Sequence, residues 1–507
     1  MLVPLALAAQ NTATREPVTV TGLGTLAFPV TTASSEARHA FLRGTLLLHL
    51  FHYGEARAEF RDAERLDPGF TMAWWGEAMA WNYGVWNIQF PDSARAALAR
   101  LGRTAVARAA KARSPRERAY LEAVEALYGR GGKAQRDTAY AAAVAELARK
   151  YPQDDEAKLF HALALLGLNQ GVRDVPAYER ALAIALEVFR RHPDHPGASH
   201  YVIHASDDPA HATTGLDAAR ALAASSPAAE HAQHMTSHVF LALGMWDDVV
   251  AANERATHTD SAMHAMPGMR ACGHGISWLH YGYLSQGRVA KAATLLQRCQ
   301  SAAAAVGDRT RADDTDPDAS SVFSAVAMWA RYIIDTEEWS GEQARWQPAL
   351  GTAPGPRQTY YFARSFAAGR RGDLVEARSS QAALLLANGE ATKRAVDAHD
   401  RSPERLESAK RASILDLELQ GVIASAEGKH DEAVTALTQA TAIEDGTAYA
   451  FGPPYIEKPS HELLGEELLL IKRAGEARTE FERALKTTPR RPLALRGLAL
   501  ATAAAGR

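Results

Sequence analysis

The sequence predicts an all-α protein, a curved solenoid of about eleven helical hairpins closed by a C-terminal capping helix. A pattern of small and large residues returns along the chain, and alanine-rich stretches such as Ala139–Ala148 favour helix. Runs of β-branched and aromatic residues with period two, typical of strands, are rare. A chain of 507 residues is too long for one compact core. We therefore predict a single repeat array over residues 35–507, with no sheet.

The repeats are clearest in three segments. The first, GTLLLHLFHYGEARAEFRDAERLDP, places small or large residues at Gly44, Ala56, Phe60, Ala63 and Pro68. The second, LLGEELLLIKRAGEARTEFERALKTTP, repeats them at Gly465, Ala477, Phe481, Ala484 and Pro489. The third, GVIASAEGKHDEAVTALTQA, carries Gly421, Ala433, Leu437 and Ala440. Small residues let two helices approach, a larger one fills the gap, and proline ends the second helix. This spacing is that of the tetratricopeptide repeat (TPR).

Weaker copies fill the rest of the chain. We expect hairpins near 36–67, 71–113, 116–151, 154–192, 196–225, 229–258, 270–305, 320–348, 358–388, 408–444 and 459–488. A last helix over Pro492–Ala505 would cap the array. Polar stretches predict longer loops at Gly307–Asp318, Gly351–Arg357 and Asn388–Glu407.

The segments HPGASHYVIHASDDPAHA, HAQHMTSHVFLALGMWDDVVAANERA and GPPYIEKPSHELLGE resemble a family of bacterial TPR proteins, many of them exported. The resemblance extends from about Ser35 onward. It implies the fold but no activity, since that family has no settled biochemical role. TPR proteins in general bind an extended peptide or a partner protein in the concave groove that their first helices line.

The first residues, MLVPLALAAQ, are similar to the end of a secretory signal, because a short apolar run precedes the small residues Ala8 and Ala9. We expect residues 1–10 to be a signal-peptide remnant and the protein to be exported, periplasmic or secreted; the alternative is a cytoplasmic protein with an apolar tail. No run reaches transmembrane length.

Cys272 and Cys299 lie on the two arms of one predicted hairpin at heights that differ by about 5 Å. Two alternatives are therefore open, a disulfide between them or two buried free thiols.

Histidines supply the most informative chemistry. Two H-x-x-x-H spacings, His200 with His204 and His234 with His238, each place two imidazoles on one face of a helix. The pairs are 34 residues apart (234 − 200 and 238 − 204), which is the TPR period. They therefore occupy equivalent positions on neighbouring first helices. By resemblance to the TPR pattern these positions line the groove, and His231, His274 and Tyr281 fall on it too.

Three interpretations of this patch are open. It is a polar groove whose histidines hydrogen-bond to each other or to a peptide, a transition-metal site, or a metalloenzyme centre. Neutral imidazole suits zinc, copper or iron, and the two pairs offer up to four nitrogens. In an enzyme, Asp207, Asp208 or Glu230 would complete the site or act as general base. The zinc-protease pattern H-E-x-x-H is absent, since Tyr201 and Met235 fill its second place.

Charged residues continue the predicted groove. Arg331, Glu418, Glu462 and Glu466 fall on groove positions, so a ligand with both amine and acid groups, such as a peptide, would fit; the alternative is a set of solvated surface residues. The chain holds 56 basic and 59 acidic residues without long basic runs, which disfavours nucleic acid. Phosphate-binding loops and G-x-S-x-G elbows are absent. We expect a scaffold that binds a peptide or protein in the groove, with a multi-histidine metal protein or metalloenzyme as the alternative.

Overall fold

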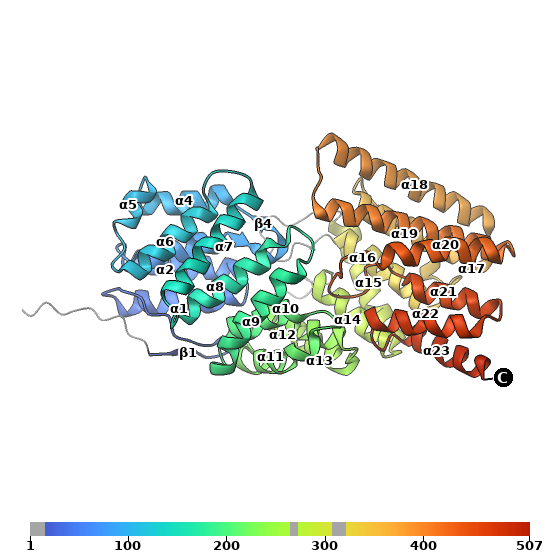
Figure 1. Ribbon diagram of the computed structural model, residues 1–507, viewed down its shortest axis with the longest axis horizontal. Coiled ribbons are helices and arrows are strands. Elements are labelled where there is room, and N and C mark those ends of the chain that lie inside the picture. The colour runs from blue at the N-terminus through green and yellow to red at the C-terminus, as the bar shows by residue number, and fades with distance from the viewer. Residues whose placement is uncertain (1–15, 264–271, 307–320, 507) are drawn as a thin grey trace, which may run out of the picture. The chain divides into compact units, whose positions relative to one another are not determined.

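A computed structural model describes residues 16–263, 272–306 and 321–506, and in these residues the protein is almost wholly helical (Figure 1). The all-α class is therefore confirmed. The helices of the described residues are α1 Ser35–His49, α2 Tyr53–Leu66, α3 Thr71–Met79, α4 Pro91–Leu101, α5 Ala105–Ala109, α6 Pro115–Leu127, α7 Lys133–Lys150, α8 Asp155–Leu166, α9 Val175–Arg191, α10 Pro196–Ser206, α11 Ala212–Ser225, α12 Glu230–Ala242, α13 Trp246–Met263, α14 His274–Ser285, α15 Val289–Val306, α16 Ser321–Thr336, α17 Pro354–Arg371, α18 Leu374–Asp397, α19 Pro403–Ala426, α20 His430–Glu444, α21 Ser460–Leu470, α22 Ala474–Thr487 and α23 Pro492–Ala505.

Packing divides the chain into two compact units. The first unit comprises Met1–Asn169, Asp174–Ala205 and Asp217–Ala232, and the second comprises Gln170–Arg173, Ser206–Leu216 and Gln233–Arg507. Both are built of antiparallel helical hairpins. In the second unit α18 packs on α17 and α19, and α21, α22 and α23 follow one another as neighbours (Figure 1).

The same contact closes the hairpins of both units. A Cβ atom built on Gly44 of α1 would lie 3.0 Å from the ring of Phe60 in α2, and one built on Gly465 of α21 would lie 2.9 Å from the ring of Phe481 in α22. Both phenylalanines are fully buried. The predicted packing of a glycine on one helix against a phenylalanine on the other thus determines how closely the two helices approach.

Most predicted hairpins match the observed helices, and the capping helix α23 spans the residues predicted for it. One predicted hairpin holds additional elements and another is wrong. The range 71–113 also holds a short strand pair and α5, and the range 320–348 holds one helix, α16, followed by the 3₁₀ turn Gln343–Arg345. The loop predicted over 388–407 is wrong as well, because α18 continues to Asp397 and Ser402 caps α19 by accepting a hydrogen bond from the Arg405 amide.

The expectation of no sheet is wrong at two places. Strand β1 (Val18–Val20) pairs antiparallel with β2 (Gly24–Leu26), and β3 (Asn82–Tyr83) pairs with β4 (Ile88–Gln89). The first pair precedes the predicted start of the repeats. It leads into Phe28, whose ring lies 5.3 Å from that of Phe41, so this segment belongs to the core of the first unit.

Cys272 and Cys299 form a disulfide, with Cα atoms 4.6 Å apart. The bridge joins the residues before α14 to α15, as their places on one predicted hairpin allowed.

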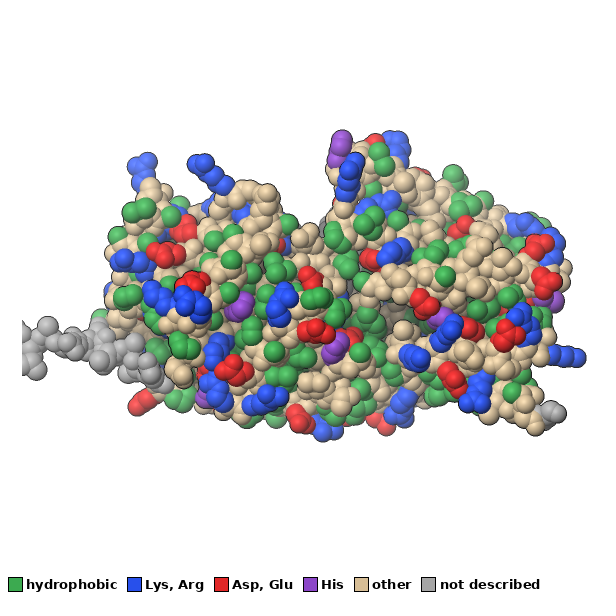
Figure 2. All heavy atoms as spheres, viewed as in Figure 1, with side chains coloured by type: hydrophobic (Ala, Val, Ile, Leu, Met, Phe, Trp, Pro, Cys, Tyr) green, Lys and Arg blue, Asp and Glu red, His purple; other side chains and the backbone are tan. Residues whose placement is uncertain are grey.

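None of the described helices is long and apolar enough to span a membrane. On the face drawn in Figure 2, basic and acidic side chains are interspersed, in line with their near-equal numbers. The proposed signal remnant, residues 1–10, lies outside the described residues.

Candidate metal centre

The six histidines predicted to share the groove form two sets of three. In each set one ring nitrogen from each residue lies within 4.8 Å of the others. The first-unit triad is His200, His204 and His231, and the second-unit triad is His234, His238 and His274. Each H-x-x-x-H pair therefore acquires a third imidazole. His231 stands at the start of α12 and His274 at the start of α14.

In the second-unit triad, hydrogen bonds fix which nitrogen of His234 carries the proton. Its Nδ1 lies 2.7 Å from Oδ1 of Asn253. The Asn253 amide nitrogen donates to the Val249 carbonyl at 2.9 Å, so the amide oxygen is the atom that faces the imidazole. Nδ1 of His234 must then donate, and its Nε2 keeps the lone pair when the ring is neutral.

His238 is oriented in the same way by a carboxylate. Its Nδ1 donates to Oδ2 of Asp207 at 3.0 Å, which leaves the lone pair on Nε2. The Nε2 atoms of His234 and His238 lie 3.3 Å apart. Burial, followed by the neighbouring His274, lowers the pKa of both rings well below 6.5, so both are neutral at pH 7. Two nitrogen lone pairs therefore face each other.

This arrangement has the geometry that a tetrahedral metal centre requires. In a tetrahedral centre with metal–nitrogen bonds of about 2.0–2.1 Å, two ligand nitrogens lie about 3.3–3.4 Å apart. The separation of the two Nε2 atoms matches that edge. A carboxylate on the far nitrogen of a ligating histidine is the usual outer partner, and Asp207 occupies that place on His238.

Asp207 is itself held by Arg173, whose Nη1 lies 2.5 Å from its Oδ1. Burial raises the pKa of Asp207 to about 6, against the opposing effect of Arg173, so the carboxylate is ionised at pH 7. Asp208 pairs with Arg173 at 2.7 Å and with His211 at 2.8 Å. Of the three acids predicted to complete the site, Asp207 thus touches the triad, Asp208 faces Arg173 and His211, and Glu230 is the first residue of α12.

Aromatic rings enclose the second-unit triad. The ring of Trp278 stacks on His238 at 4.3 Å between centroids, and Phe451 stacks on the same histidine at 5.2 Å. Both His234 and His238 are only 3% exposed. These positions, which the repeat pattern assigned to the groove, are therefore part of a packed interior.

The structure also reveals a cluster that sequence reasoning missed: His49, Glu156 and His195 in the first unit. Nε2 of each histidine donates to one oxygen of Glu156, at 2.8 Å and 2.9 Å. The hydroxyl of Tyr201 donates to Nδ1 of His49, and the Ala198 amide donates to Nδ1 of His195. Each ring nitrogen of His49 and His195 thus takes part in a hydrogen bond, so the cluster is a hydrogen-bonded network rather than a metal centre. No spacing signals it, because its members come from distant segments.

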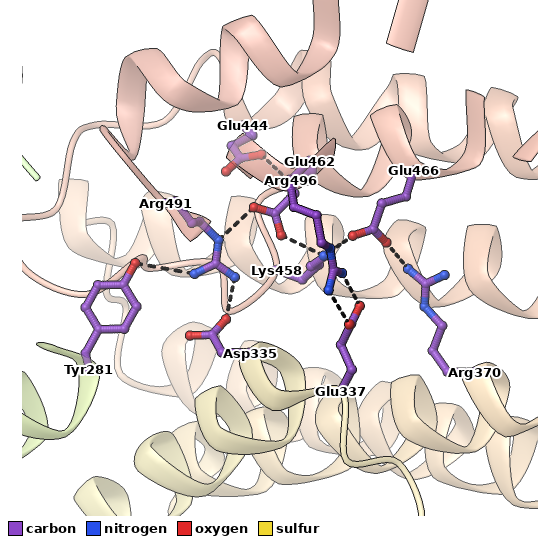
Figure 3. A network of polar contacts seen from close by, with 11 residues as sticks. Tyr281, Asp335, Glu337, Arg370, Glu444, Lys458, Glu462, Glu466, Arg491 and Arg496 are labelled. Carbon is purple, nitrogen blue, oxygen red and sulfur yellow. Dashed lines mark hydrogen bonds and ion pairs between the residues drawn. The ribbon is translucent and has the colours of Figure 1, made fainter. Parts of the chain in front are cut away.

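Three of the remaining predicted groove residues, Tyr281, Glu462 and Glu466, lie in a buried ionic network of the second unit (Figure 3). Glu462 accepts from Lys458 at 2.6 Å and from Arg491 at 2.8 Å, while Glu466 contacts Lys458 and Arg370. Arg491 also reaches the Tyr281 hydroxyl at 3.3 Å. These predicted groove residues are thus brought together but bind each other through Arg491, Lys458 and Arg370, which sequence reasoning missed.

Arg331 and Glu418 have separate surroundings. Nη1 of Arg331 lies 3.4 Å from Oγ of Ser277, and burial lowers the pKa of the guanidinium. Glu418 accepts from the Ser460 hydroxyl at 2.6 Å, and burial raises the pKa of its carboxyl well above 4.5. Neither side chain lies among the three histidine clusters.

Neither a protein-family model nor a curated protein matches this sequence. Among solved structures, the chain is similar to the Cut9–Hcn1 hetero-tetramer of the APC/C at 13% identity, with 92% of this chain and 76% of that chain covered and a TM-score of 0.34. Yeast Tom70 gives 11% identity, 94% and 90% coverage and a TM-score of 0.36. The human IFIT1 dimer with m7Gppp-AAAA is 13% identical, with 94% of this chain and 92% of that chain covered and a TM-score of 0.36. Nothing about the function of this chain follows from likenesses at this level.

Proposed function

We propose that this protein binds a transition-metal ion through Nε2 of His234 and His238 and a ring nitrogen of His274. The observation that carries the proposal is the 3.3 Å separation of two Nε2 atoms whose partner nitrogens both donate to oxygen. Imidazole nitrogen suits zinc, copper or iron. Three protein ligands leave a fourth position for water or for a ligand that the protein presents to the metal.

The charge balance supports a divalent ion. An imidazole that binds a metal is neutral, and Asp207 brings one negative charge to the outer face of His238. Arg173 offsets part of that charge but also fixes the carboxylate, and with it the ring plane of His238. The protein side thus supplies orientation and one compensating carboxylate.

The test uses the full chain, purified without a histidine tag. We expect one zinc equivalent to be lost from the His234→Ala/His238→Ala variant, measured by elemental analysis after dialysis. The matched control is His258→Ala, which removes an exposed histidine of α13 in the same unit. A double variant that holds as much metal as the parent would contradict the proposal, as would a parent that takes up no metal on challenge.

A second candidate is binding of a peptide, favoured by a cleft of about 690 Å³ among α17, α18 and α19. Its lining is largely small or polar, which suits an extended peptide held by main-chain hydrogen bonds. The lining includes Gln358, Asn388, Thr392, Arg405, Ser408 and Ala412. Peptides selected by display on the parent should lose binding to Ala412→Trp, which fills the cleft. Peptides indifferent to that change would contradict the proposal.

We also propose that the protein matures in an oxidising compartment, as an exported protein does. The Cys272–Cys299 disulfide supports this, because such bridges persist outside the reducing cytosol. Non-reducing peptide mass spectrometry on protein from its native cell should show the linked peptides. Two free thiols there would contradict export.

A further inference from the structure

We propose that the first-unit triad, His200, His204 and His231, is a second and independent metal centre. His200 and His204 lie one turn apart on α10, with ring centroids 4.7 Å apart. The ring of His231 lies 5.3 Å from that of His200. The three ligand nitrogens fall within 4.8 Å of one another, and a small inward rotation of the rings would bring them within the roughly 4.2 Å that bonds to one ion allow.

A backbone carbonyl fixes the ligand nitrogen of His200. Its Nδ1 lies 2.6 Å from the carbonyl oxygen of His49, and a carbonyl only accepts, so Nδ1 donates and Nε2 keeps the lone pair. His49 is the last residue of α1, where helix carbonyls lack intrahelical partners. A carbonyl is a usual outer partner of a ligating histidine.

The hydrogen-bonded cluster described above gives this carbonyl a fixed place. The imidazole of His49 is held between the Tyr201 hydroxyl at 2.7 Å and the Glu156 carboxylate at 2.8 Å. Tyr201 neighbours His200 in α10, so the same contacts position both ends of the hydrogen bond. The His49–Glu156–His195 cluster thereby has a role: it orients a ligand of the neighbouring centre.

The walls of this centre are aromatic. The ring of Phe51 lies 4.3 Å from His200, 5.5 Å from His204 and 5.7 Å from His231. Phe51 occupies the left-handed position of the α1–α2 turn at φ +60°, where glycine stands in the turns at Gly244, Gly287, Gly372 and Gly428. A bulky residue is disfavoured there relative to glycine. The position of its ring over three imidazoles accounts for that choice.

Imidazole nitrogen suits copper as well as zinc and iron, so copper(I) serves as the probe for this centre. The experiment is an anaerobic titration of the full, untagged chain with copper(I), kept reduced by ascorbate and read against bicinchoninate. We expect His200→Ala/His204→Ala to bind one copper(I) equivalent fewer than the parent, while the exposed-site control His192→Ala binds as many. Equal copper(I) binding by the double variant and the parent overturns the proposal.

Two further variants keep the test valid if the double variant does not fold. His231→Ala removes a half-buried ligand and should lower copper(I) affinity at least about tenfold. Phe51→Gly keeps all three ligands and relieves the left-handed backbone, so stoichiometry should hold while copper transfer to bicinchoninate becomes faster. Unchanged affinity in His231→Ala overturns the assignment. The His234→Ala/His238→Ala variant should keep this copper(I) equivalent, which separates the outcome from that of the second-unit centre.

Discussion

Phe451 stacks on His238 with ring centroids 5.2 Å apart and planes inclined by 27°. It belongs to the segment between α20 and α21, and it is 37% exposed, so it covers the histidine from the solvent side. We predict that Phe451→Ala speeds metal release several-fold, because water gains access to the His238 ligand, with little loss of stability. Stopped-flow transfer of zinc to a chelator measures this. Tyr455→Ala, a 39% exposed aromatic of the same segment, is the control, and equal acceleration by both would rule out a specific cover.

Asp207 orients His238, so we predict that its substitution lowers the affinity of the proposed centre for metal. Asp207→Asn removes the charge that holds the proton on Nδ1 of His238, and loss of such an outer partner typically costs 10–100-fold in metal affinity. Asp208→Asn is the matched control, since Asp208 contacts Arg173 and His211 instead. Competition with a chromophoric chelator gives both affinities. If both variants lose affinity equally, the effect comes from the Arg173 network as a whole.

The packing of the capping helix offers a test of the repeat logic. The ring of Phe481 lies between Gly465 of its own hairpin and Gly497 of α23, and a methyl group at Gly497 would overlap that ring. Because Phe481 is fully buried, the overlap outweighs the better helix propensity of alanine, and Gly497→Ala should cost about 1–3 kcal/mol. Gly475→Ala, a helical site with no atom within 4 Å, should be neutral or slightly stabilising. Thermal unfolding compares the two.

Sequence spacing could predict the helices and the glycine–phenylalanine contacts because both are set by local periodicity and close packing. The 34-residue offset also placed His200 with His204 and His234 with His238 on matching turns. It also placed His231 and His274 near these pairs, but it could not predict that the six histidines divide into two triads, because that depends on how successive helices pack. The partners Asp207, Asn253 and the His49 carbonyl depend on tertiary contacts too.

The ionic network shows the same limit. Spacing placed Glu462 and Glu466 on one helix face, but it treated that face as an open groove. Arg491, at the start of α23, and Lys458, in the segment before α21, fill it from segments that the repeat register does not describe. The repeat register therefore predicts the helix face on which a side chain lies. Whether that side chain is buried depends on the other segments that pack against this face.

His461 gives a pH-dependent prediction away from both triads. Burial lowers the pKa of its imidazole, but hydrogen bonds to Glu480 at 2.6 Å and to Asp445 at 3.0 Å outweigh burial and raise the pKa above 6.5. A raised histidine pKa stabilises the fold below pH 6.5, and that stability is lost as the pH rises through the folded-state pKa.

His461→Gln should therefore destabilise the second unit by about 1–2 kcal/mol near pH 5.5 and by much less near pH 8.5, because hydrogen bonds to charged groups contribute more than neutral ones. Urea unfolding at the two pH values, followed by circular dichroism on metal-free protein, measures the difference. The exposed-site variant His258→Gln controls for general effects of pH on the protein. A His461→Gln penalty that stays constant or grows toward pH 8.5 would mean that the imidazole is neutral in the fold, and that Glu480 and Asp445 hold it without a charge.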